Sequence, residues 1–452
     1  MSDTIAAVST GTQVCAIGIV RMSGGKAIEI ADRLFSPVSG RKMADCEDRK
    51  LIYGKLCDEQ GRLLDICLCT ISRAPNSYTG EDTAEFQCHG SPVVLRAVLE
   101  AAFSLGARQA LPGEFTKRAF LNGRMDLSGA EAVADIIDAE TAEAARNAAG
   151  QLGGAISRRI DEIYGTLTDI SSHYHAVLDY PDEDIEDFTL ARYESDIERC
   201  TAVLESLRAS YDSGKLLHSG VPAAIVGRPN AGKSSLLNAV LGYDRAIVTD
   251  IPGTTRDTIE EKLRLGGVLL RLTDTAGIRK TDDEIERMGV TRSRRAMEQA
   301  ELVLAVIDGH SEITPEDLEL IKCAERAPHG IVILSKHDLG SLSKMPETTL
   351  PVIEISSVTG EGLDKLEDTV RALFPMPAAP AGEILTNARQ FDAVSRALEA
   401  MKAAGDAMRL GCTPDIVLTE TETAMAALGE LTGRTVREEV TNRIFERFCV
   451  GK

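Results

Sequence analysis

The stretch GRPNAGKSS (Gly227–Ser235) decides the fold of the middle of the chain. It fits the pattern G-x-x-x-x-G-K-[ST], it follows the short apolar run Ala223–Val226, and a helix is expected to begin near its last residue. Glycines let such a loop wrap around a phosphate, so that backbone N–H groups and the positive end of the helix point at the anion. Lys233 is expected to bridge the β- and γ-phosphates, and the Ser234 hydroxyl to bind Mg²⁺.

Short apolar segments alternate with expected helices from this loop to Phe374. Such alternation is typical of an α/β domain with a mostly parallel sheet. The expected strands are Ala223–Val226, Leu269–Thr273, Leu302–Ile307, Ile331–Leu334 and Val352–Ile355.

Three further motifs follow in the order of a guanine-nucleotide site. DTAG (Asp274–Gly277) places a carboxylate to hold Mg²⁺ through water, and TDIPGTTRD (Thr249–Asp257) offers Thr255 as a second Mg²⁺ ligand. In Ser335–Asp338 (SKHD), Asp338 can accept hydrogen bonds from two guanine N–H groups, which adenine does not offer. The expected GTP-binding residues are Asn230, Ala231, Gly232, Lys233, Ser234, Ser235, Thr249, Asp250, Ile251, Pro252, Gly253, Thr254, Thr255, Asp274, Thr275, Ala276, Gly277, Ser335, Lys336, Asp338, Ser356 and Ser357.

The residue after DTAG is Ile278, where Ras-like GTPases carry the glutamine that positions the attacking water. An isoleucine side chain neither donates nor accepts a hydrogen bond, so another group must orient the water. The acidic stretch Asp282–Glu286 lies just beyond, and Glu286 is the predicted residue, acting through a bridging molecule. On spacing alone, the alternative that these acids are solvated loop residues stays open.

The sequence on either side of this module differs from it. Residues 1–118 indicate a mixed α/β region with strands at Val14–Met22, Ile66–Ile71 and Thr83–His89. Within the second of these, Cys67 and Cys69 share a face, and we interpret them as buried thiols, with a chemical role left open. Apolar residues at 152, 156, 160, 163, 167, 170, 174 and 177 predict one stripe on a long helix, packed within the chain or against a second copy. A further helix is expected over 190–217, and more helices after 382.

Composition excludes several classes of protein. The chain has 452 residues, a formal charge of −20 and an ordinary hydrophobic fraction of 43%, which argue for several globular domains. No apolar run reaches eighteen residues, the first residues do not resemble a secretion signal, and the ten cysteines form no C-x-x-C pair. We therefore expect a soluble, cytoplasmic protein without a membrane segment.

The motifs together resemble one family over the whole chain. PNSYTGED (Pro75–Asp82), PGEFTKRAFLNGRMDLSGAEAVADIID (Pro112–Asp138) and the terminal CVGK (Cys449–Lys452) are similar to the MnmE (TrmE) family of tRNA modification GTPases. The resemblance implies a folate-binding and dimerising N-terminal α/β domain, a helical domain, and a Ras-like P-loop GTPase domain inserted in the helical domain. The expected divisions are 1–118, 119–217, 218–376 and 377–452.

The resemblance also implies an activity. Family members work as homodimers with MnmG (GidA), an FAD protein, in a heterotetramer. They add an aminomethyl-type group to C5 of the wobble uridine, position 34, of certain tRNAs, with a one-carbon unit from 5-formyl-tetrahydrofolate. GTP hydrolysis, which needs Mg²⁺ and K⁺, drives the accompanying motion, and FAD enters only through the partner.

Residue roles follow from the same resemblance. It implies that Glu286 is catalytic. It also implies that folate binds to residues of the N-terminal part and the C-terminal tail, where one-carbon chemistry could take place. The implied K⁺ ligands are Asn230, Thr249, Ile251 and Thr254; the implied Mg²⁺ ligands are Ser234 and Thr255; the implied folate contacts are Arg21, Glu85, Arg124 and Lys452; and Cys449 has a possible chemical role.

Two substitutions and one rival function are open at this point. Ser335 replaces the usual asparagine of the guanine motif, which puts GTP affinity in question, and Arg124 stands where relatives often have lysine. The net charge of −20 is unusual for a protein that contacts tRNA phosphates. The rival is a ribosome- or RNA-associated regulatory GTPase without modification chemistry.

Overall fold

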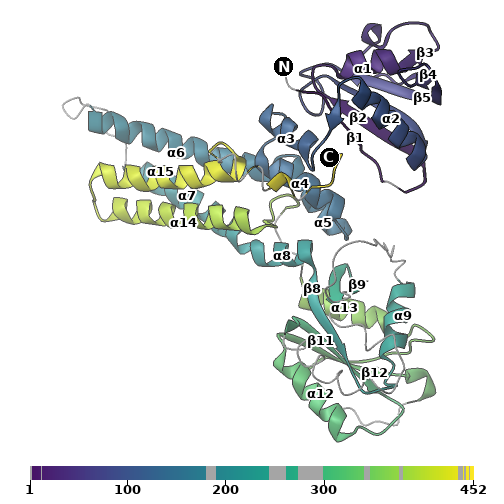
Figure 1. Cartoon of the computed structure of the whole chain (residues 1–452). Coiled ribbons are helices and arrows are strands. Elements are labelled where there is room, and N and C mark those ends of the chain that lie inside the picture. Colours follow the sequence, from purple (N-terminus) through teal and green to yellow (C-terminus); the bar gives the residue numbers. More distant parts are fainter. Residues whose placement is uncertain are drawn as a thin grey trace. The chain divides into compact units, whose positions relative to one another are not determined.

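The computed structural model describes residues 3–11, 13–179, 190–243, 261–272, 299–340, 347–375, 380–435, 441, 444–446 and 448–451. The chain divides into two compact units. The first comprises residues 1–137, 149–201 and 396–452, and the second comprises 138–148 and 202–395. Figure 1 shows the elements of each unit.

The first unit contains a seven-stranded sheet with the strand order β3-β4-β5-β6-β2-β1-β7. Neighbouring strands are antiparallel, except that β1 and β7 run parallel. The strands predicted within 14–22, 66–71 and 83–89 are confirmed, whereas the other four had not been predicted. The strands are β1 (Ile5–Val8), β2 (Cys15–Ser23), β3 (Phe35–Pro37), β4 (Ile52–Cys57), β5 (Leu63–Ser72), β6 (Thr83–Gly90) and β7 (Arg108–Gln109).

The two faces of this sheet have different surroundings because side chains alternate along each strand. Val20, Phe86 and Ile71 point to one face, where they form a core with α1 (Ala27–Leu34) and α2 (Pro92–Ser104). The intervening residues, such as Arg21 and Glu85, belong to the opposite face, which carries polar side chains together with the exposed Ile17 and Tyr53. This open face carries the pocket described below.

Helices make up the rest of the first unit. α6 (Ala155–Asp179) packs against α15 (Pro414–Thr432), and the two lie side by side in Figure 1. α4 (Leu127–Asp138) contributes Ala130 and Val133 to a cluster with Phe445 and Phe448 near the C-terminus. α3 (Glu114–Leu121) contributes Phe115, which is buried against β1. Among the described helices, four have residues in both units: α4, by its last residue Asp138, α5 (Ala142–Leu152), α7 (Leu190–Ala209) and α14 (Ala388–Arg409).

Two helix predictions need correction. The apolar stripe does lie on α6, where Ile156, Ile160 and Leu167 are buried within the chain. Leu152, however, belongs to α5, because Gly153 and Gly154 interrupt the helix and Gly154 has a φ of +78°.

The helix expected over 190–217 is also two helices, α7 and α8 (Tyr211–Ser219). They meet at Ser210, whose hydroxyl donates to the Leu207 carbonyl and accepts the N–H of Leu385. The side chain of Ser210 thus bonds to backbone groups at the junction, which competes with a continuous helix.

The second unit contains a six-stranded sheet with the order β13-β12-β11-β8-β10-β9. All neighbours are parallel except β9 and β10, so the prediction of a mostly parallel sheet is confirmed. All five predicted strands are present, and among the described residues of this unit β9 is the one strand that was not predicted. The strands are β8 (Val221–Val226), β9 (Glu261–Leu265), β10 (Val268–Leu272), β11 (Leu302–Asp308), β12 (His329–Ser335) and β13 (Val352–Glu354).

Helices cover both faces of this second sheet. Leu236 of α9 (Lys233–Tyr243) and Leu366 of α13 (Leu363–Leu373) pack on one face. Ile321 of α12 (Pro315–Arg326) packs on the other face. None of the helices in the described ranges is long and apolar enough to span a bilayer.

We predict that Asn147→Ala destabilises the second unit by about 2–4 kcal/mol. The buried Asn147 amide donates to the Ile384 carbonyl at 3.1 Å and accepts the Gly382 N–H at 2.8 Å, so its removal leaves two backbone groups without these bonds. Urea unfolding checks the effect. Asn238→Ala, an exposed position on α9, is the control and changes stability by less than about 0.5 kcal/mol. Equal stability of the two variants would contradict the prediction.

Candidate nucleotide loop and sheet-face pocket

The loop between β8 and α9 has the geometry of a phosphate cradle. A side chain at Gly227 would place its Cβ 2.4 Å from the Val306 carbonyl oxygen of β11, so only glycine fits there. Gly232 has a φ of +96°, which also requires glycine. α9 begins at Lys233, two residues before the predicted start near Ser235, and its N-terminus therefore faces the loop.

The Lys233 side chain folds back over this loop. Its Nζ donates to the carbonyls of Gly227 at 2.6 Å and Arg228 at 2.8 Å. Burial lowers the pKa of Lys233. Phosphate oxygens beside Nζ would favour the charged form and reverse this shift, which suits the lysine to an anionic ligand.

The guanine motif lies beside the phosphate loop. The Ser335 hydroxyl, only 2% exposed, is 2.6 Å from the carbonyl of Ala231 and 3.1 Å from that of Ile307. Lys336 Nζ donates to Asp308 Oδ2 at 2.6 Å, and the Ser356 hydroxyl donates to Asp338 Oδ1 at 2.7 Å. The structure therefore brings together the described parts of the phosphate and base motifs, and serine bridges them in place of asparagine.

Some of the other predicted nucleotide-site residues lie within the described ranges, and the rest lie outside them. Asn230, Ser234 and Ser235 are exposed at the start of α9 and in its loop, and Ser357 is half-buried next to Ser356. The remaining predictions lie outside the described residues: Thr249, Asp250, Ile251, Pro252, Gly253, Thr254, Thr255, Asp274, Thr275, Ala276, Gly277, Glu286 and Lys452.

A pocket of about 340 Å³ lies on the open face of the first sheet. Arg21 and Glu85, two of the predicted ligand-binding residues, both line it, and Arg21 Nε donates to Glu85 Oε1 at 2.7 Å. The Arg21 guanidinium lies 5.5 Å from the ring centroid of Tyr78 and 5.8 Å from that of Phe115. The other lining residues are Arg49, Leu51, Thr70, Ser72, Tyr78, Thr79, Thr83 and Gln87.

The loop of the PNSYTGED motif forms one wall of this pocket and is held by α3 and the turn that follows it. The Tyr78 hydroxyl is 2.9 Å from the Thr116 hydroxyl, and Asn122 Nδ2 donates to the Thr79 carbonyl at 2.7 Å. The two long motifs that carried the resemblance therefore contact each other. Sequence reasoning had missed Tyr78 as a pocket residue, although its place inside the first motif was a usable signal.

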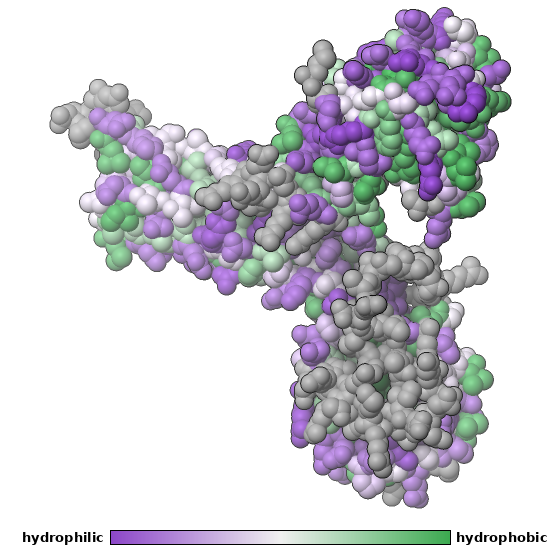
Figure 2. Space-filling model, viewed as in Figure 1, coloured by the Kyte–Doolittle hydropathy of each residue, from purple (hydrophilic) through white to green (hydrophobic). Residues whose placement is uncertain are grey.

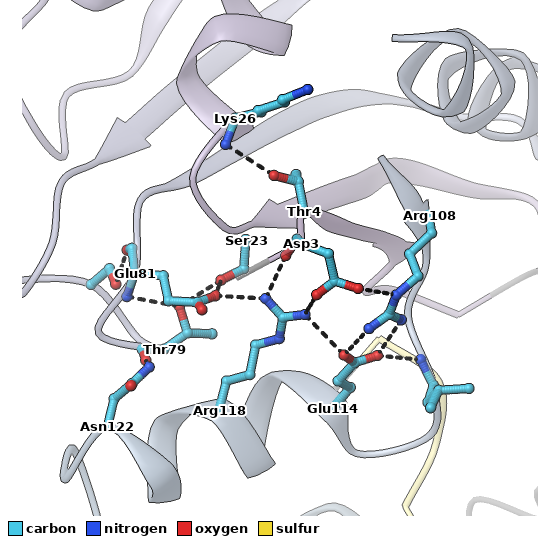
Figure 3. Close-up of polar contacts among 12 residues, drawn as sticks. Asp3, Thr4, Ser23, Lys26, Thr79, Glu81, Arg108, Glu114, Arg118 and Asn122 are labelled. Atoms are coloured by element: carbon cyan, nitrogen blue, oxygen red, sulfur yellow. Dashed lines mark hydrogen bonds and ion pairs between the residues drawn. The ribbon is translucent and has the colours of Figure 1, made fainter. Parts of the chain in front are cut away.

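Arg118 stands at the centre of the polar contacts in Figure 3. Its guanidinium donates to Glu81 at 2.9 Å, to Glu114 at 3.0 Å and to the side chain of Asp3 at 2.7 Å. Arg108 adds two hydrogen bonds to Glu114. Burial alone would lower the pKa of Arg118, but the hydrogen bonds to Glu81 and Glu114 outweigh it and raise that pKa.

The remaining predicted contacts lie near the same loop and the tail. A Cβ at Gly80 would be 3.3 Å from Cγ of Arg124, so the Arg124 stem lies directly beside Gly80. Cys449 is exposed, and its neighbour Val450 forms a β-bridge with Pro112. The Ser9 hydroxyl donates to the Gly451 carbonyl at 3.0 Å, which places the tail at the end of β1.

Two sequence profiles match the chain. One, described as the MnmE helical domain, covers residues 127–449, and the other, described as the GTP-binding protein TrmE N-terminus, covers residues 4–124. A tRNA modification GTPase MnmE from Symbiobacterium thermophilum is 42% identical over all of this chain and 99% of its own length. The chain belongs to the MnmE family.

A second MnmE relative agrees with this assignment. The MnmE protein of Clostridioides difficile is 39% identical, with full coverage of both chains. Among solved structures, the G domain of the FeoB iron transporter of T. maritima is 27% identical over 34% of this chain and 98% of its own, with a TM-score of 0.26.

We predict that Glu114→Gln reduces the loss of stability in acid. Burial would raise the pKa of Glu114, but hydrogen bonds from Arg108, the Leu111 N–H and Arg118 lower it. A carboxyl whose pKa is lowered by folding stabilises the protein fully above its unfolded pKa of about 4.3, and this stability is lost as pH falls through the lower folded value.

Urea unfolding between pH 6 and pH 3 measures this dependence. The wild-type slope should exceed that of Glu114→Gln by up to about 1.4 kcal/mol per pH unit. Glu59→Gln, at an exposed position in the β4–β5 hairpin, should keep the wild-type slope. Identical slopes for wild type and Glu114→Gln would rule out this role.

Proposed function

We propose that this chain is a GTP-hydrolysing tRNA modification protein. With an FAD-dependent partner of the MnmG (GidA) type, it adds an aminomethyl-type group to C5 of the wobble uridine, position 34, of certain tRNAs. The one-carbon unit comes from 5-formyl-tetrahydrofolate. Membership of the MnmE family, whose named members are tRNA modification GTPases, supports the proposal.

The observation that carries the proposal is the pocket built around Arg21 and Glu85, in a chain that also has a phosphate loop. The Glu85 carboxylate suits the N–H groups of an aminopyrimidine, and the Arg21 guanidinium suits a carboxylate. Tyr78 offers an aromatic face beside them. A regulatory GTPase without one-carbon chemistry would not require a folate pocket of this kind. Arg124, beside Gly80, and Lys452, next to Gly451, complete the proposed folate contacts.

The second unit supplies the proposed GTPase. Lys233 binds the β- and γ-phosphates, Ser234 and Thr255 hold Mg²⁺, and Asp338 selects guanine. Asn230, Thr249, Ile251 and Thr254 would hold K⁺, which would supply positive charge beside the phosphates. Glu286 orients the attacking water in place of the missing glutamine. Ser335 keeps the phosphate and base loops together through its contact with Ala231.

The first unit supplies the proposed homodimer contact. Ile17 and Tyr53 on the sheet and Leu51, just before β4, are exposed, and Figure 2 shows hydrophobic residues at the surface of this part of the chain. An exposed apolar set of this kind is typical of a protein interface. The GTPase region, 218–376, is proposed as an insertion between the helical regions 119–217 and 377–452, after an N-terminal domain of residues 1–118.

The rival function, a regulatory GTPase bound to ribosome or RNA, shares the nucleotide loop but not the pocket. It predicts GTP hydrolysis without folate binding. Measuring folate binding by the full chain therefore separates the two functions.

We predict that 5-formyl-tetrahydrofolate binds the full-length chain and that Arg21→Met and Glu85→Gln each weaken binding about 10–100-fold. That range corresponds to the loss of one hydrogen bond to a charged group. Isothermal titration calorimetry measures it. Arg62→Met, on the β4–β5 turn with its side chain 73% exposed, is the control and keeps wild-type affinity. No binding by the wild type would favour the rival function.

We predict that GTP hydrolysis is at least about tenfold faster in KCl than in NaCl at equal ionic strength, and that Asn230→Ala removes the difference. Equal rates of the wild type in the two salts would reject the K⁺ site.

We predict that Glu286→Ala lowers turnover about 10²–10⁴-fold while GTP affinity stays within about twofold. Asp283→Ala, in the same acidic stretch, is the matched control and keeps wild-type turnover. If both variants hydrolyse GTP at the wild-type rate, these acids are solvated loop residues.

A further inference from the structure

Two cysteines face each other across the β5–β6 pair. Leu68 of β5 lies opposite Gln87 of β6, so the antiparallel register places Cys67 opposite Cys88. Both thiols lie on the core side of the sheet, where Cys67 is 5% and Cys88 1% exposed. The sequence showed Cys67 beside Cys69 on one strand, but it gave no sign that Cys88 is the neighbour of Cys67.

A carboxylate completes the group. Asp65 lies two residues before Cys67 on β5, and its oxygen and the two sulfur atoms all lie within 4.8 Å of one another. Zn–S bonds of about 2.3 Å and Zn–O bonds of about 2.0–2.2 Å place tetrahedral donors roughly 3.3–3.8 Å apart. Small side-chain movements therefore suffice to bring the three donors onto one ion.

The Asp65 carboxylate is held in place by its surroundings. Its Oδ1 accepts the Ile66 N–H at 2.7 Å and lies 2.9 Å from Nδ1 of His89, and its Oδ2 accepts the His89 N–H at 2.8 Å. The Asp65 side chain is only 10% exposed. Metal-binding carboxylates are oriented by hydrogen bonds of this kind, and losing such a partner usually weakens metal binding.

The charge balance also favours a cation. A bound dication stabilises thiolates and displaces their protons. The Asp65 carboxylate beside the two sulfurs would repel a lone thiolate but would help to hold a metal ion.

We propose that Asp65, Cys67 and Cys88 bind one zinc-type divalent cation, with water in the fourth position. Two thiolates select a soft or borderline metal over Mg²⁺ or Ca²⁺. The ion joins β5 to β6 on the core side, whereas Thr70 and Glu85 of the same two strands line the pocket on the open face. The site thus fixes the register of two strands of the pocket floor.

The test uses the full-length chain, without an affinity tag, reduced, treated with a chelator and then dialysed against Zn²⁺. Inductively coupled plasma mass spectrometry should find about one zinc ion per chain, and Cys67→Ser and Cys88→Ser should each lose it. Cys69→Ser is the matched control, on the same strand and face and fully buried, and it keeps the metal. Wild-type protein without zinc, or an equal metal content in all variants, would overturn the site.

A further variant, at an exposed residue, tests the metal site even if Cys67→Ser and Cys88→Ser unfold the chain. His89 is 77% exposed at its side chain, so His89→Ala leaves the core intact while it removes the imidazole beside Asp65. It should weaken Zn²⁺ binding about 10–100-fold. Co²⁺ should give a thiolate-to-cobalt absorption band that Cys69→Ser retains. The absence of a cobalt band in the reduced wild-type protein would reject the metal site.

Discussion

The ion pairs of Arg118 hold the first unit's pocket in shape. One guanidinium on α3 reaches Glu81 in the loop of the first motif, Glu114 on its own helix and Asp3 at the N-terminal strand. A buried cation of this kind must be paired, because removing one partner costs about 3–5 kcal/mol. The position of the pocket wall therefore depends on charges that never touch the pocket.

In the second unit, too, polar contacts of single side chains hold loops in place. The Ser335 hydroxyl contacts the carbonyl of Ala231, so one side chain joins the loop proposed to bind the base to the loop proposed to bind the phosphates. Lys336 and Asp338 are fixed by Asp308 and Ser356 in turn. In both units, a functional loop is ordered by polar contacts from a neighbouring element. Binding then costs less ordering entropy.

The sequence predicted most of the second unit because its signals are local. The phosphate loop needs glycines at fixed positions, and buried parallel strands are continuous apolar runs, so β8, β11 and β12 were all located. β9 was missed because its apolar residues alternate with charged ones and form no continuous apolar run. The helix break at Ser210 depends on its bond with Leu385, which is remote in the sequence.

Only some of the pocket residues could be predicted, because their contacts join residues that are far apart in the sequence. Arg21 and Glu85 were identified through the family resemblance, but their pairing across β2 and β6 appears only in the register. Tyr78 and Arg118 belong to motifs that were visible in the sequence, yet their contact partners are about 40 residues away. The juxtaposition of Cys67 and Cys88 likewise required the fold.

The central claim is that one chain joins a one-carbon pocket to a GTPase for the modification of a single tRNA base. Mass spectrometry of the wobble uridine, in cells whose only copy of this protein carries Glu85→Gln or Lys233→Ala, tests it most directly. The claim predicts that both alleles sharply lower the share of position 34 that carries the aminomethyl-type group, although the proteins accumulate normally. Full modification with Glu85→Gln would contradict it.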